Sequence, residues 1–544
     1  MKYNLRIAAI VNESCMFKWQ AEIIDQLHKS NNVSIDFILL VPTLKKAHTK
    51  PLLAFFQKIG QVFFLLHKKL DGMLFSDGNS LMRHLNHEKI FKGVKRIKWT
   101  ESENDFKNQF QMLDAVLMFG RMKLSSKILD IPKYGFWDLT SEDVKSNLEC
   151  LPGYWELVNH TPELITNLNL ICPENQSKTI YQSSQITDFF SFYKNNQNHL
   201  KRLQLITLRV IQNLSEQGEG YFHSLVEKNR RISKNSESTL RSVPDLYNSL
   251  KNFSGHVNFL LQDSIFKFIY SDYWFVLIGT QKVNSAFGDF KEFIAIDSPK
   301  DRFWADPFVI SRNDRHYIFV EELLYKTGKG RISHIELNDD GKVLNTSVVL
   351  EKEYHMSYPL IFQYEGVDYM IPETKENRSI DLYRCEKFPD QWFFVKTLIA
   401  DVYAVDATPY WYEGKWWLFA NVDEFDGNSS INDELYLFYS DDLFSGQWVS
   451  HPKNPIVSDV KSARPAGRIF EENGKIFRPS QDCSLRYGYA LNMNRITKLS
   501  EDDYEEVLER KILPDWLPGL KRNHTINFGS NAAVIDAFKW RRKF

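Results

Sequence analysis

Cysteine is scarce in this sequence and widely spaced. The 544 residues contain five cysteines, an odd number, and no two of them have the CxxC spacing. This pattern argues against a disulfide framework and against a zinc site, and it favours a reducing compartment. We therefore expect no bound metal. The cysteines are Cys15, Cys150, Cys172, Cys385 and Cys483.

An excess of charge of one sign is also missing. The chain has 68 basic and 69 acidic residues, which nearly cancel. No field of the whole chain would attract nucleic acid, so nucleic-acid partners are not expected. Any site for an anion must be formed locally by a few side chains.

Long apolar runs are absent as well. The segment 52–70, "LLAFFQKIGQVFFLLHKKL", comes nearest, but Gln57, Lys58 and Gln61 interrupt it. We interpret it as an amphipathic helix facing a core, with an interfacial membrane helix as the alternative. The run "IAAIV" near the N-terminus is too short for a signal peptide and predicts a buried strand. We expect no transmembrane segment and a cytoplasmic location.

The first 180 residues alternate short apolar runs with helical patterns. "LRIAAIV", "SIDFILLV" and "LDAVLMFG" predict strands, and residues 17–30 predict a helix between two of them. Continuous apolar strands of this kind are typical of a buried, mostly parallel sheet. Residues 1–180 are therefore predicted to form a Rossmann-like α/β domain. Neither GxGxxG nor P-loop spacing supports nucleotide binding there.

A polar, helical segment follows at residues 181–270. "HLKRLQLITLRVIQNL" has apolar residues at helical spacing, and "RRISKNSESTLRS" is a charged stretch. Such a segment fits a helical connector between two domains, or a helical extension of the first domain.

Residues 271–544 have the alternation of aromatic, β-branched and polar residues that is typical of antiparallel sheet. Four similar units each contain a proline, a polar turn and a second aromatic-rich strand, and their prolines lie 52, 50 and 56 residues apart. This period suits the blades of a β-propeller. Segments 272–280 and 526–540 would pair as a fifth blade that closes the ring. The prolines are Pro307, Pro359, Pro409 and Pro465.

The repeat also predicts a site at the propeller axis, because equivalent residues of different blades converge there. Asp306, Tyr358, Thr408 and Arg464 each precede one of these prolines. Carboxylates and aromatic rings in one cavity are suited to sugar chemistry. The predicted catalytic residues are Asp306, Glu373, Asp406 and Glu321.

A second set of residues is expected to bind the substrate. Three arginines near the axis would suit a phosphate, a carboxylate or a nucleotide-sugar group. The alternative is that they neutralise Glu321, Glu373 and Asp482 in a structural ion-pair network. The predicted substrate-binding residues are Tyr358, His355, Arg464, Arg468, Arg478, Gln481, Asp482 and His524.

Several motifs in this half resemble a known family. "FWADPFV", "HMSYPLIFQYEGVDYMIPE", "SARPAGRIF", "FRPSQDCSLRYG" and "NHTIN" are similar to the N-terminal five-bladed propeller domain of glucosamine inositolphosphorylceramide transferases and its bacterial relatives. That propeller is similar to family 43 glycoside hydrolases. The resemblance implies a carbohydrate-active fold over residues 275–540. It implies that Asp306 is a general base, Glu373 the acid and Asp406 the modulator of its pKa.

The first domain resembles another family. "GFWDLT" and "LPGYWELVN", within residues 116–159, are similar to the N-terminal domain of formyltransferases. Active members carry Asn and His where this chain has Asp138 and Thr140. Without that histidine, formyltetrahydrofolate is not expected as a cofactor, and the domain is interpreted as a catalytically lapsed scaffold.

Three functional hypotheses follow. The first is a protein of surface-glycan or glycolipid metabolism whose propeller cleaves or transfers a sugar. The second is a binding module for a glycan or a sugar nucleotide that performs no chemistry. The third is an amino-sugar formyltransferase fused to a propeller.

Overall fold

The structure is a computed structural model in which three stretches, 51–61, 104–105 and 230–233, are described by backbone only. Cys15 and Cys150 lie outside the described residues, as do parts of the charged stretch 230–242. The chain divides into two compact units, Met1–Ser183 with Thr187–Leu261, and Ser184–Ile186 with Gln262–Phe544. The described residues are 3–13, 16–42, 51–76, 78–85, 93–99, 104–120, 124–140, 152–173, 177–233, 245–280, 288–425, 427, 430–444 and 446–543.

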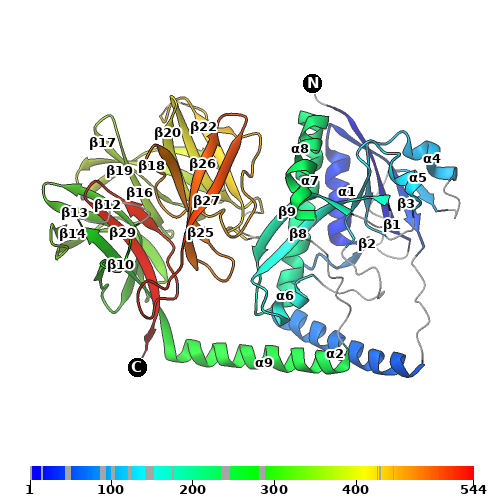
Figure 1. The fold of residues 1–544 in the computed structure, drawn as a ribbon, viewed down its shortest axis with the longest axis horizontal. Helices are drawn as coiled ribbons and strands as arrows, with labels where there is room; N and C mark the ends of the chain where they lie inside the picture. Colours follow the sequence, from blue (N-terminus) through cyan, green and yellow to red (C-terminus); the bar gives the residue numbers. More distant parts are fainter. Residues whose placement is uncertain are drawn as a thin grey trace. The chain divides into compact units, whose positions relative to one another are not determined.

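A seven-stranded sheet forms the centre of the N-terminal unit, in the order β5-β3-β1-β6-β7-β8-β9 (Figure 1). β1 pairs in parallel with β3 and β6, whereas β7 and β8 are antiparallel. The apolar runs of β1 and β3 are buried, as expected of strands covered on both faces. The predicted α/β architecture is confirmed. The strands are β1 (Leu5–Asn12), β3 (Val33–Val41), β5 (Arg96–Lys98), β6 (Ala115–Met118), β7 (Phe136–Asp138), β8 (Glu163–Ile171) and β9 (Ser177–Ile186).

Helices contribute to two apolar cores, one for each set of alternating side chains of β1. One core contains residues of α1 (Lys18–Lys29), α7 (Phe192–Gln217) and α8 (Glu219–Ser233). The other contains residues of α4 (Asn104–Phe110) and α5 (Ser126–Leu129). α7 and α8 are thus part of the N-terminal unit, which agrees with a helical extension of the first domain.

Three short elements and two long helices remain to be described. β2 (Met16–Phe17) pairs with β4 (His84–Leu85), and α6 (Tyr154–Val158) precedes β8. Two long helices are α2 (Pro51–Phe75) and α9 (Leu246–Ile269), the second of which leads into the propeller. None of the described helices combines the length and the apolar character needed to cross a bilayer.

The second unit is a five-bladed β-propeller made of five four-stranded sheets (Figure 1). Blades one to four follow the sequence in order, each as an antiparallel meander, which confirms the prediction from the repeat. Blade one is β12 (Arg302–Arg312), β13 (Arg315–Leu324), β14 (Lys329–Asn338) and β15 (Val343–Leu350); blade two is β16 (Ser357–Tyr364), β17 (Val367–Glu373), β18 (Ser379–Lys387) and β19 (Gln391–Ala400); blade three is β20 (Ala404–Tyr412), β21 (Lys415–Val422), β22 (Leu435–Ser440) and β23 (Val449–Ser450); blade four is β24 (Phe470–Glu472), β25 (Lys475–Asp482), β26 (Ala490–Leu499) and β27 (Tyr504–Ile512).

The fifth blade joins segments from both ends of the propeller sequence. Its strand order is β11-β10-β29-β28, built from β10 (Tyr270–Thr280), β11 (Ile294–Ile296), β28 (Ile526–Phe528) and β29 (Ala532–Arg542). β10 and β29 are antiparallel and paired from Tyr270↔Arg542 to Thr280↔Ala532. The predicted closure is therefore confirmed, and it pairs strand edges that would otherwise be open.

Candidate functional site

The innermost strands of blades one, two and three share a bulge near their first residues. The register shifts between Ala305 and Phe308, between Ser357 and Leu360, and between Val405 and Thr408. The bulges contain Asp306, Tyr358 and Asp406, whose φ values are 50°, 44° and 53°.

This equivalence corrects the sequence alignment of blade three. We predicted Thr408, the residue before Pro409, to be equivalent to Asp306, but the bulge places Asp406 there. Pro409 lies within the strand opposite Leu418, and Ala407 occupies the position that proline takes in the other two blades. The alignment by prolines was wrong in this blade, because Pro409 lies two residues later in its strand than the prolines of blades one and two.

The second strand of each blade contributes a polar side chain at the same level. Glu321 lies opposite Ala305, Glu373 opposite Ser357, and Asn421 opposite Val405. In blade four the Gln481 N–H donates to the Arg464 carbonyl at 2.8 Å, and in blade five the Asp536 N–H donates to the Thr525 carbonyl at 3.1 Å. The ring of polar side chains is Glu321, Glu373, Asn421, Gln481 and Asp536.

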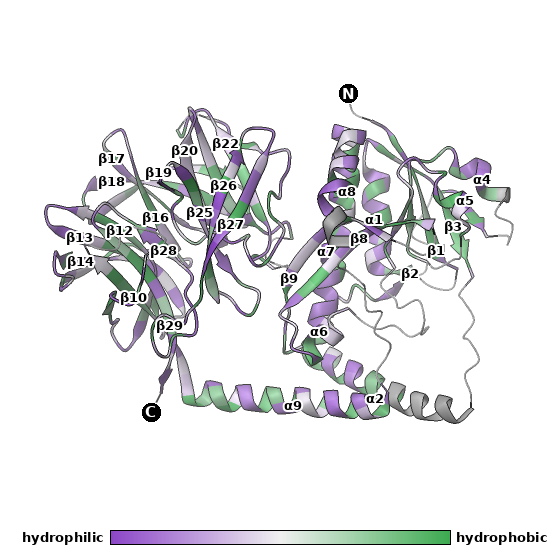
Figure 2. Cartoon of the chain, viewed as in Figure 1, coloured by the Kyte–Doolittle hydropathy of each residue, from purple (hydrophilic) through white to green (hydrophobic). Residues whose placement is uncertain are grey.

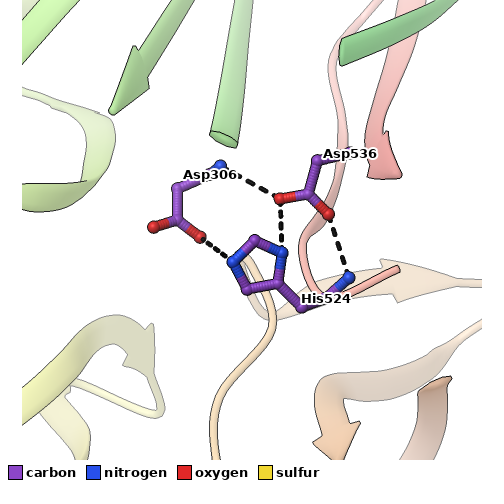
Figure 3. A group of neighbouring side chains, drawn as sticks. All are labelled: Asp306, His524 and Asp536. Carbon is purple, nitrogen blue, oxygen red and sulfur yellow. Dashed lines mark hydrogen bonds and ion pairs between the residues drawn. The ribbon is translucent and has the colours of Figure 1, made fainter. Parts of the chain in front are cut away.

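Asp306, His524 and Asp536 form one buried cluster across the junction of blades one and five (Figure 3). The imidazole of His524 lies between the two carboxylates, with Nδ1 2.6 Å from Asp536 Oδ2 and Nε2 3.3 Å from Asp306 Oδ1. The Asp306 N–H also donates to Asp536 Oδ2 at 3.0 Å. Thr525 and the Tyr358 N–H donate to Asp306 at 2.6 and 3.2 Å.

The charges in this cluster depend on one another. Burial raises the pKa of Asp306 to about 7, and Glu321 and Asp406 add to the rise while His524 opposes it. Burial alone would lower the pKa of His524, but the charges of Asp536 and Asp306 outweigh burial and raise it to about 9. The imidazole is therefore charged near neutral pH, and Asp306 exchanges its proton in the range useful for acid–base chemistry.

The same three residues have donor atoms close enough to surround a cation. A metal ligand histidine must, however, be neutral and offer a free ring nitrogen. Here both nitrogens of His524 face carboxylate oxygens, and both oxygens of Asp536 accept backbone N–H groups. The cluster therefore fits a site in which the charged imidazole of His524, and not a metal ion, balances the two carboxylates.

A second charged group joins blades two, three and four. The Arg464 Nε donates to Asp406 Oδ2 at 2.7 Å, and its guanidinium lies 3.8 Å from Glu373. Lys375 lies 3.2 Å from Glu373 on the other side. Burial raises the pKa of Asp406 to about 6, although Arg464 opposes the rise.

Glu321 and His355 form the remaining ion pair, with Nε2 3.2 Å from Oε1. Burial would lower the pKa of His355, but the hydrogen bond to Glu321 and the charges of Glu321 and Glu373 together outweigh burial and raise the pKa. The side chain of His355 is 22% exposed and that of Lys375 28%, against 6% for Asp306. His355 and Lys375 are therefore the more exposed members of these charged groups.

Aromatic rings pack against the buried cluster. The ring centroids of Trp274 and Tyr487 lie 4.2 and 5.3 Å from that of His524. The guanidinium of Arg464 lies 4.8 Å from the Tyr487 centroid. Both cationic groups are thus covered by aromatic faces, which stabilises them in a buried setting.

Some predicted binding residues lie apart from these groups. Arg478 is buried in blade four, where it donates to Glu506 of β27 at 2.7 Å. Asp482 forms an ion pair with Lys511 and accepts the Ser484 N–H at 2.9 Å. Both residues are in ion pairs, but with other partners than the predicted alternative gave them, whereas Arg464 does lie near Glu373 as that alternative proposed. Gln481 reaches the site, since its amide donates to Asp406 at 3.4 Å.

Arg468 differs from the other two predicted arginines. Its guanidinium donates to the Val309 carbonyl at 3.2 Å and lies 5.9 Å from the Phe308 centroid. Among the described residues, no carboxylate forms an ion pair with it. Burial lowers the pKa of Arg468 to about 10.

The sequence analysis did not single out three residues of the site. Asp536 lies in the closing blade, which lacks the proline that marks the others. Lys375 and Tyr487 follow β17 and β25 in loops that the repeat does not cover. Aligning the fifth blade with the first would have identified Asp536, because it lies opposite Thr525 as Glu321 lies opposite Ala305.

The stability of the propeller is expected to fall as pH rises from 6.5 to 9. The folded state binds the His524 proton more tightly than the unfolded chain does, so its contribution is complete below 6.5 and is lost through 9. The loss is on the order of 3 kcal/mol in the free energy of unfolding. Urea unfolding followed by tryptophan fluorescence at several pH values measures it. The variant His524→Gln should lack this slope, and an equal slope in the variant would contradict the assignment.

Comparisons with known proteins agree with the propeller resemblance. Residues 294–515 match the family described as glucosamine inositolphosphorylceramide transferase 1, N-terminal. The protein of that name from Oryza sativa subsp. japonica is 38% identical over 208 residues, which is 38% of this chain and 28% of the relative. The one from Arabidopsis thaliana is 34% identical over 208 residues, 38% of this chain and 27% of the relative. The chain thus matches little more than a quarter of the length of these curated relatives.

Two solved structures are also similar in part. A family 117 glycoside hydrolase from Zobellia galactanivorans has a TM-score of 0.32 at 12% identity, covering 49% of this chain and 90% of its own. An arabinanase from Bacillus subtilis has a TM-score of 0.32 at 12% identity, covering 43% of this chain and 93% of its own. The assignment of the five blades rests on the strand pairings described above.

Proposed function

We propose that the propeller is a catalytic module of surface-glycan or glycolipid metabolism that cleaves or transfers a sugar. The observation that carries this proposal is the convergence of Asp306, Glu321, Glu373 and Asp406 from three blades. Burial raises the pKa of Asp306 to about 7 and that of Asp406 to about 6. Carboxyl groups in different environments provide the acid and the base of glycosidic chemistry. The propeller relatives named as transferases support a sugar as substrate.

Asp306 is proposed as the general base. It would remove a proton from water, or from an acceptor hydroxyl, as that oxygen forms a bond to the anomeric carbon. The bond from this carbon to the leaving oxygen breaks at the same time. His524 and Asp536 are positioning residues, because the imidazolium balances the charge of Asp306 and Asp536 fixes the ring.

The proton for the leaving oxygen would come from a glutamic acid. Glu373 is the first candidate, and Asp406 modulates its charge through the shared Arg464. Glu321 is the second candidate, because its partner His355 can return a proton to it after each turnover. In hydrolysis the base ends protonated and the acid ionised, and exchange with solvent restores both.

A substrate screen tests the proposal directly. The full chain is incubated with nucleotide sugars, lipid-linked sugars and simple glycosides, and products are identified by mass spectrometry. A product that forms with wild type and not with folded Asp306→Asn supports a propeller enzyme. No product from any class, combined with thermal stabilisation by one ligand, would replace the enzyme with a binding module.

Aryl glycosides identify the acid. A leaving group that departs without protonation is expected to restore the rate of an acid variant but not that of a base variant. Glu373→Gln and Glu321→Gln should therefore be compared on phenyl and nitrophenyl glycosides, with Asp306→Asn as the matched base variant. Restored turnover in Asp306→Asn would contradict its role as base.

We further propose that the ligand carries an anionic group bound by Arg468, because the other two predicted arginines already face internal carboxylates. Arg468→Ala is expected to weaken binding of a phosphorylated sugar by about 10- to 100-fold, and binding of the neutral sugar much less. Isothermal titration with both ligands measures this difference. Arg486→Ala is the matched control, because it removes an exposed arginine that follows Arg468 in blade four. Equal losses for both ligands would contradict an anion site.

The N-terminal unit is proposed to be a formyltransferase-like scaffold without catalysis. Asp138, at the end of β7, accepts the N–H and the hydroxyl of Thr140 at 2.8 and 2.6 Å. Asp138 and Thr140, which replace the Asn and His of active formyltransferases, are thus hydrogen-bonded to each other. Titration with formyltetrahydrofolate is expected to give no binding. Tight binding would support an amino-sugar formyltransferase.

A further inference from the structure

The N-terminal unit contains a pocket of about 480 Å³ between α6 and α9. This volume lies in the range of about 300–1,000 Å³ that is typical of small-molecule sites. The described lining comes from the end of α6, the turn after it, Phe189 and α9, and it does not include Asp138 or Thr140. Figure 2 shows that α9 carries both hydrophilic and hydrophobic residues, and the pocket is lined by residues of both kinds.

The α9 side of the pocket has a gap at a glycine. Lys251, Gly255 and Phe259 all line the pocket and follow one another at intervals of four residues, so they lie along one side of the helix. Gly255 is the only glycine of α9, and a Cβ atom added there would have no atom of the rest of the chain within 4 Å. A glycine inside a helix is less favourable than alanine. No close contact within the described chain requires it here, and the approach of a ligand to the helix backbone would explain it.

Aromatic rings gather at one end of the pocket. His160, in the turn after α6, has a φ of 51°. Left-handed backbone is uncommon in residues other than glycine, and it concentrates at binding and catalytic sites. The His160 ring centroid lies 5.6 Å from that of Phe189 and 6.0 Å from that of Phe259. These three rings form a surface on which a flat apolar group can pack.

Lys251 supplies positive charge, one turn of α9 away from Gly255. Its side chain is exposed, and among the described residues no carboxylate forms an ion pair with it or lines the pocket. Asn252, beside it, donates to the Tyr154 hydroxyl at 3.1 Å. His256 is a fixed wall, because its ring nitrogens lie 3.0 Å from His67 Nε2 and 2.9 Å from a backbone carbonyl oxygen.

The acidic residues near the pocket in sequence are engaged elsewhere. Glu156, Asp188 and Asp245 each accept a backbone N–H group, at 3.0, 2.7 and 2.8 Å. Glu163 and Asp263 also have interaction partners, which for Asp263 is a lysine at 2.8 Å. The described charge at the pocket is therefore positive and suits an anionic group.

We infer that this pocket binds a small organic anion with a flat, aromatic body. The body packs over Gly255 against Phe189 and Phe259, and the anionic group meets the ammonium group of Lys251. This inference does not depend on the sugar chemistry proposed for the propeller or on formyl transfer.

Two probes with the same aromatic body test the inference. 1-Naphthyl phosphate and 1-naphthol differ only by the phosphate group, and equilibrium dialysis against the full chain measures the binding of each. We expect 1-naphthyl phosphate to bind, and 1-naphthol to bind about tenfold more weakly. Lys251→Gln should weaken binding of the phosphate by about tenfold and leave binding of the naphthol unchanged. Equal affinities for the two probes would overturn the anionic class of the ligand.

Gly255 offers a matched pair of variants. Gly255→Ala adds one methyl group to open space, so it should keep the binding and raise the temperature of unfolding. Gly255→Trp should fill the pocket and lower the binding of both probes by about tenfold or more, with thermal unfolding as the check of folding.

Three outcomes would overturn the inference. The first is that wild type binds neither probe, and the second is that folded Gly255→Trp binds 1-naphthyl phosphate as wild type does. The third is a loss of binding in Arg468→Ala but not in Gly255→Trp, because the probe would then bind in the propeller.

Discussion

Replacing Asp306 with asparagine is expected to lower turnover by about 10²- to 10⁴-fold, the range that a general base contributes. Asparagine is nearly isosteric and tolerates the left-handed backbone that this bulge requires, since φ at Asp306 is 50°. The fold should therefore persist, and kcat/KM should fall because the proton acceptor is missing. Steady-state kinetics on a substrate from the screen measure the effect, with thermal unfolding as the check of folding.

Glu322→Gln provides the matched control for that experiment. Glu322 is also buried and adjoins Glu321, but it points to the opposite side of the strand, where it accepts from Arg331 at 2.7 Å and from Trp304 at 3.1 Å. Its replacement should cost stability while leaving kcat/KM close to that of the wild type. Unchanged turnover in folded Asp306→Asn would show that the carboxylate is not the base.

Replacing Asp406 with asparagine is expected to lower the free energy of unfolding by about 3 kcal/mol, because the buried Arg464 loses its partner at 2.7 Å and keeps Glu373 at 3.8 Å. The Arg464 side chain is 8% exposed and that of Asp406 3%. Asparagine keeps the left-handed backbone of the bulge, where φ is 53°, so the loss reports charge rather than strain. Urea unfolding followed by tryptophan fluorescence measures the difference.

An exposed pair gives the comparison for this result. Asp441 pairs with Lys415, and its side chain is 83% exposed, so Asp441→Asn should cost less than about 1 kcal/mol. Adding Arg464→Gln to Asp406→Asn should recover part of the loss, since no charge then remains unpaired. If the two single aspartate variants lost equal stability, the pair at the site would not be structurally important.

The propeller could be predicted because its repeat can be recognised from residue types in short stretches of the sequence. Proline, a polar turn and an aromatic strand recur in four blades, and strand-like segments at both ends suggested the fifth. The site was predictable where that local pattern holds, as at Asp306, Glu321 and Glu373. The prediction was wrong at Thr408. Strand register depends on hydrogen bonds between strands, and in this blade the proline lies two residues later than in blades one and two.

Other features depend on contacts that no local pattern contains. Asp536 belongs to the site because β28 and β29 complete a ring that begins with β12, and its partners His524 and Asp306 lie 12 and 230 residues away in sequence. The apolar spacing of 52–70 predicted a helix, yet it could not tell which apolar side would be covered. The sequence predicted Arg478 near the axis, but in the structure it pairs with Glu506 of β27 within blade four.

The closure of the ring sets the point in synthesis at which the candidate site can be completed. Blades one to four are complete once residue 512 has been made, but Asp306 still lacks His524, Thr525 and Asp536. β10, made more than 250 residues before β29, must wait for it before the fifth blade can form. The nascent chain therefore lacks the complete Asp306, His524 and Asp536 cluster until the two ends of the propeller meet.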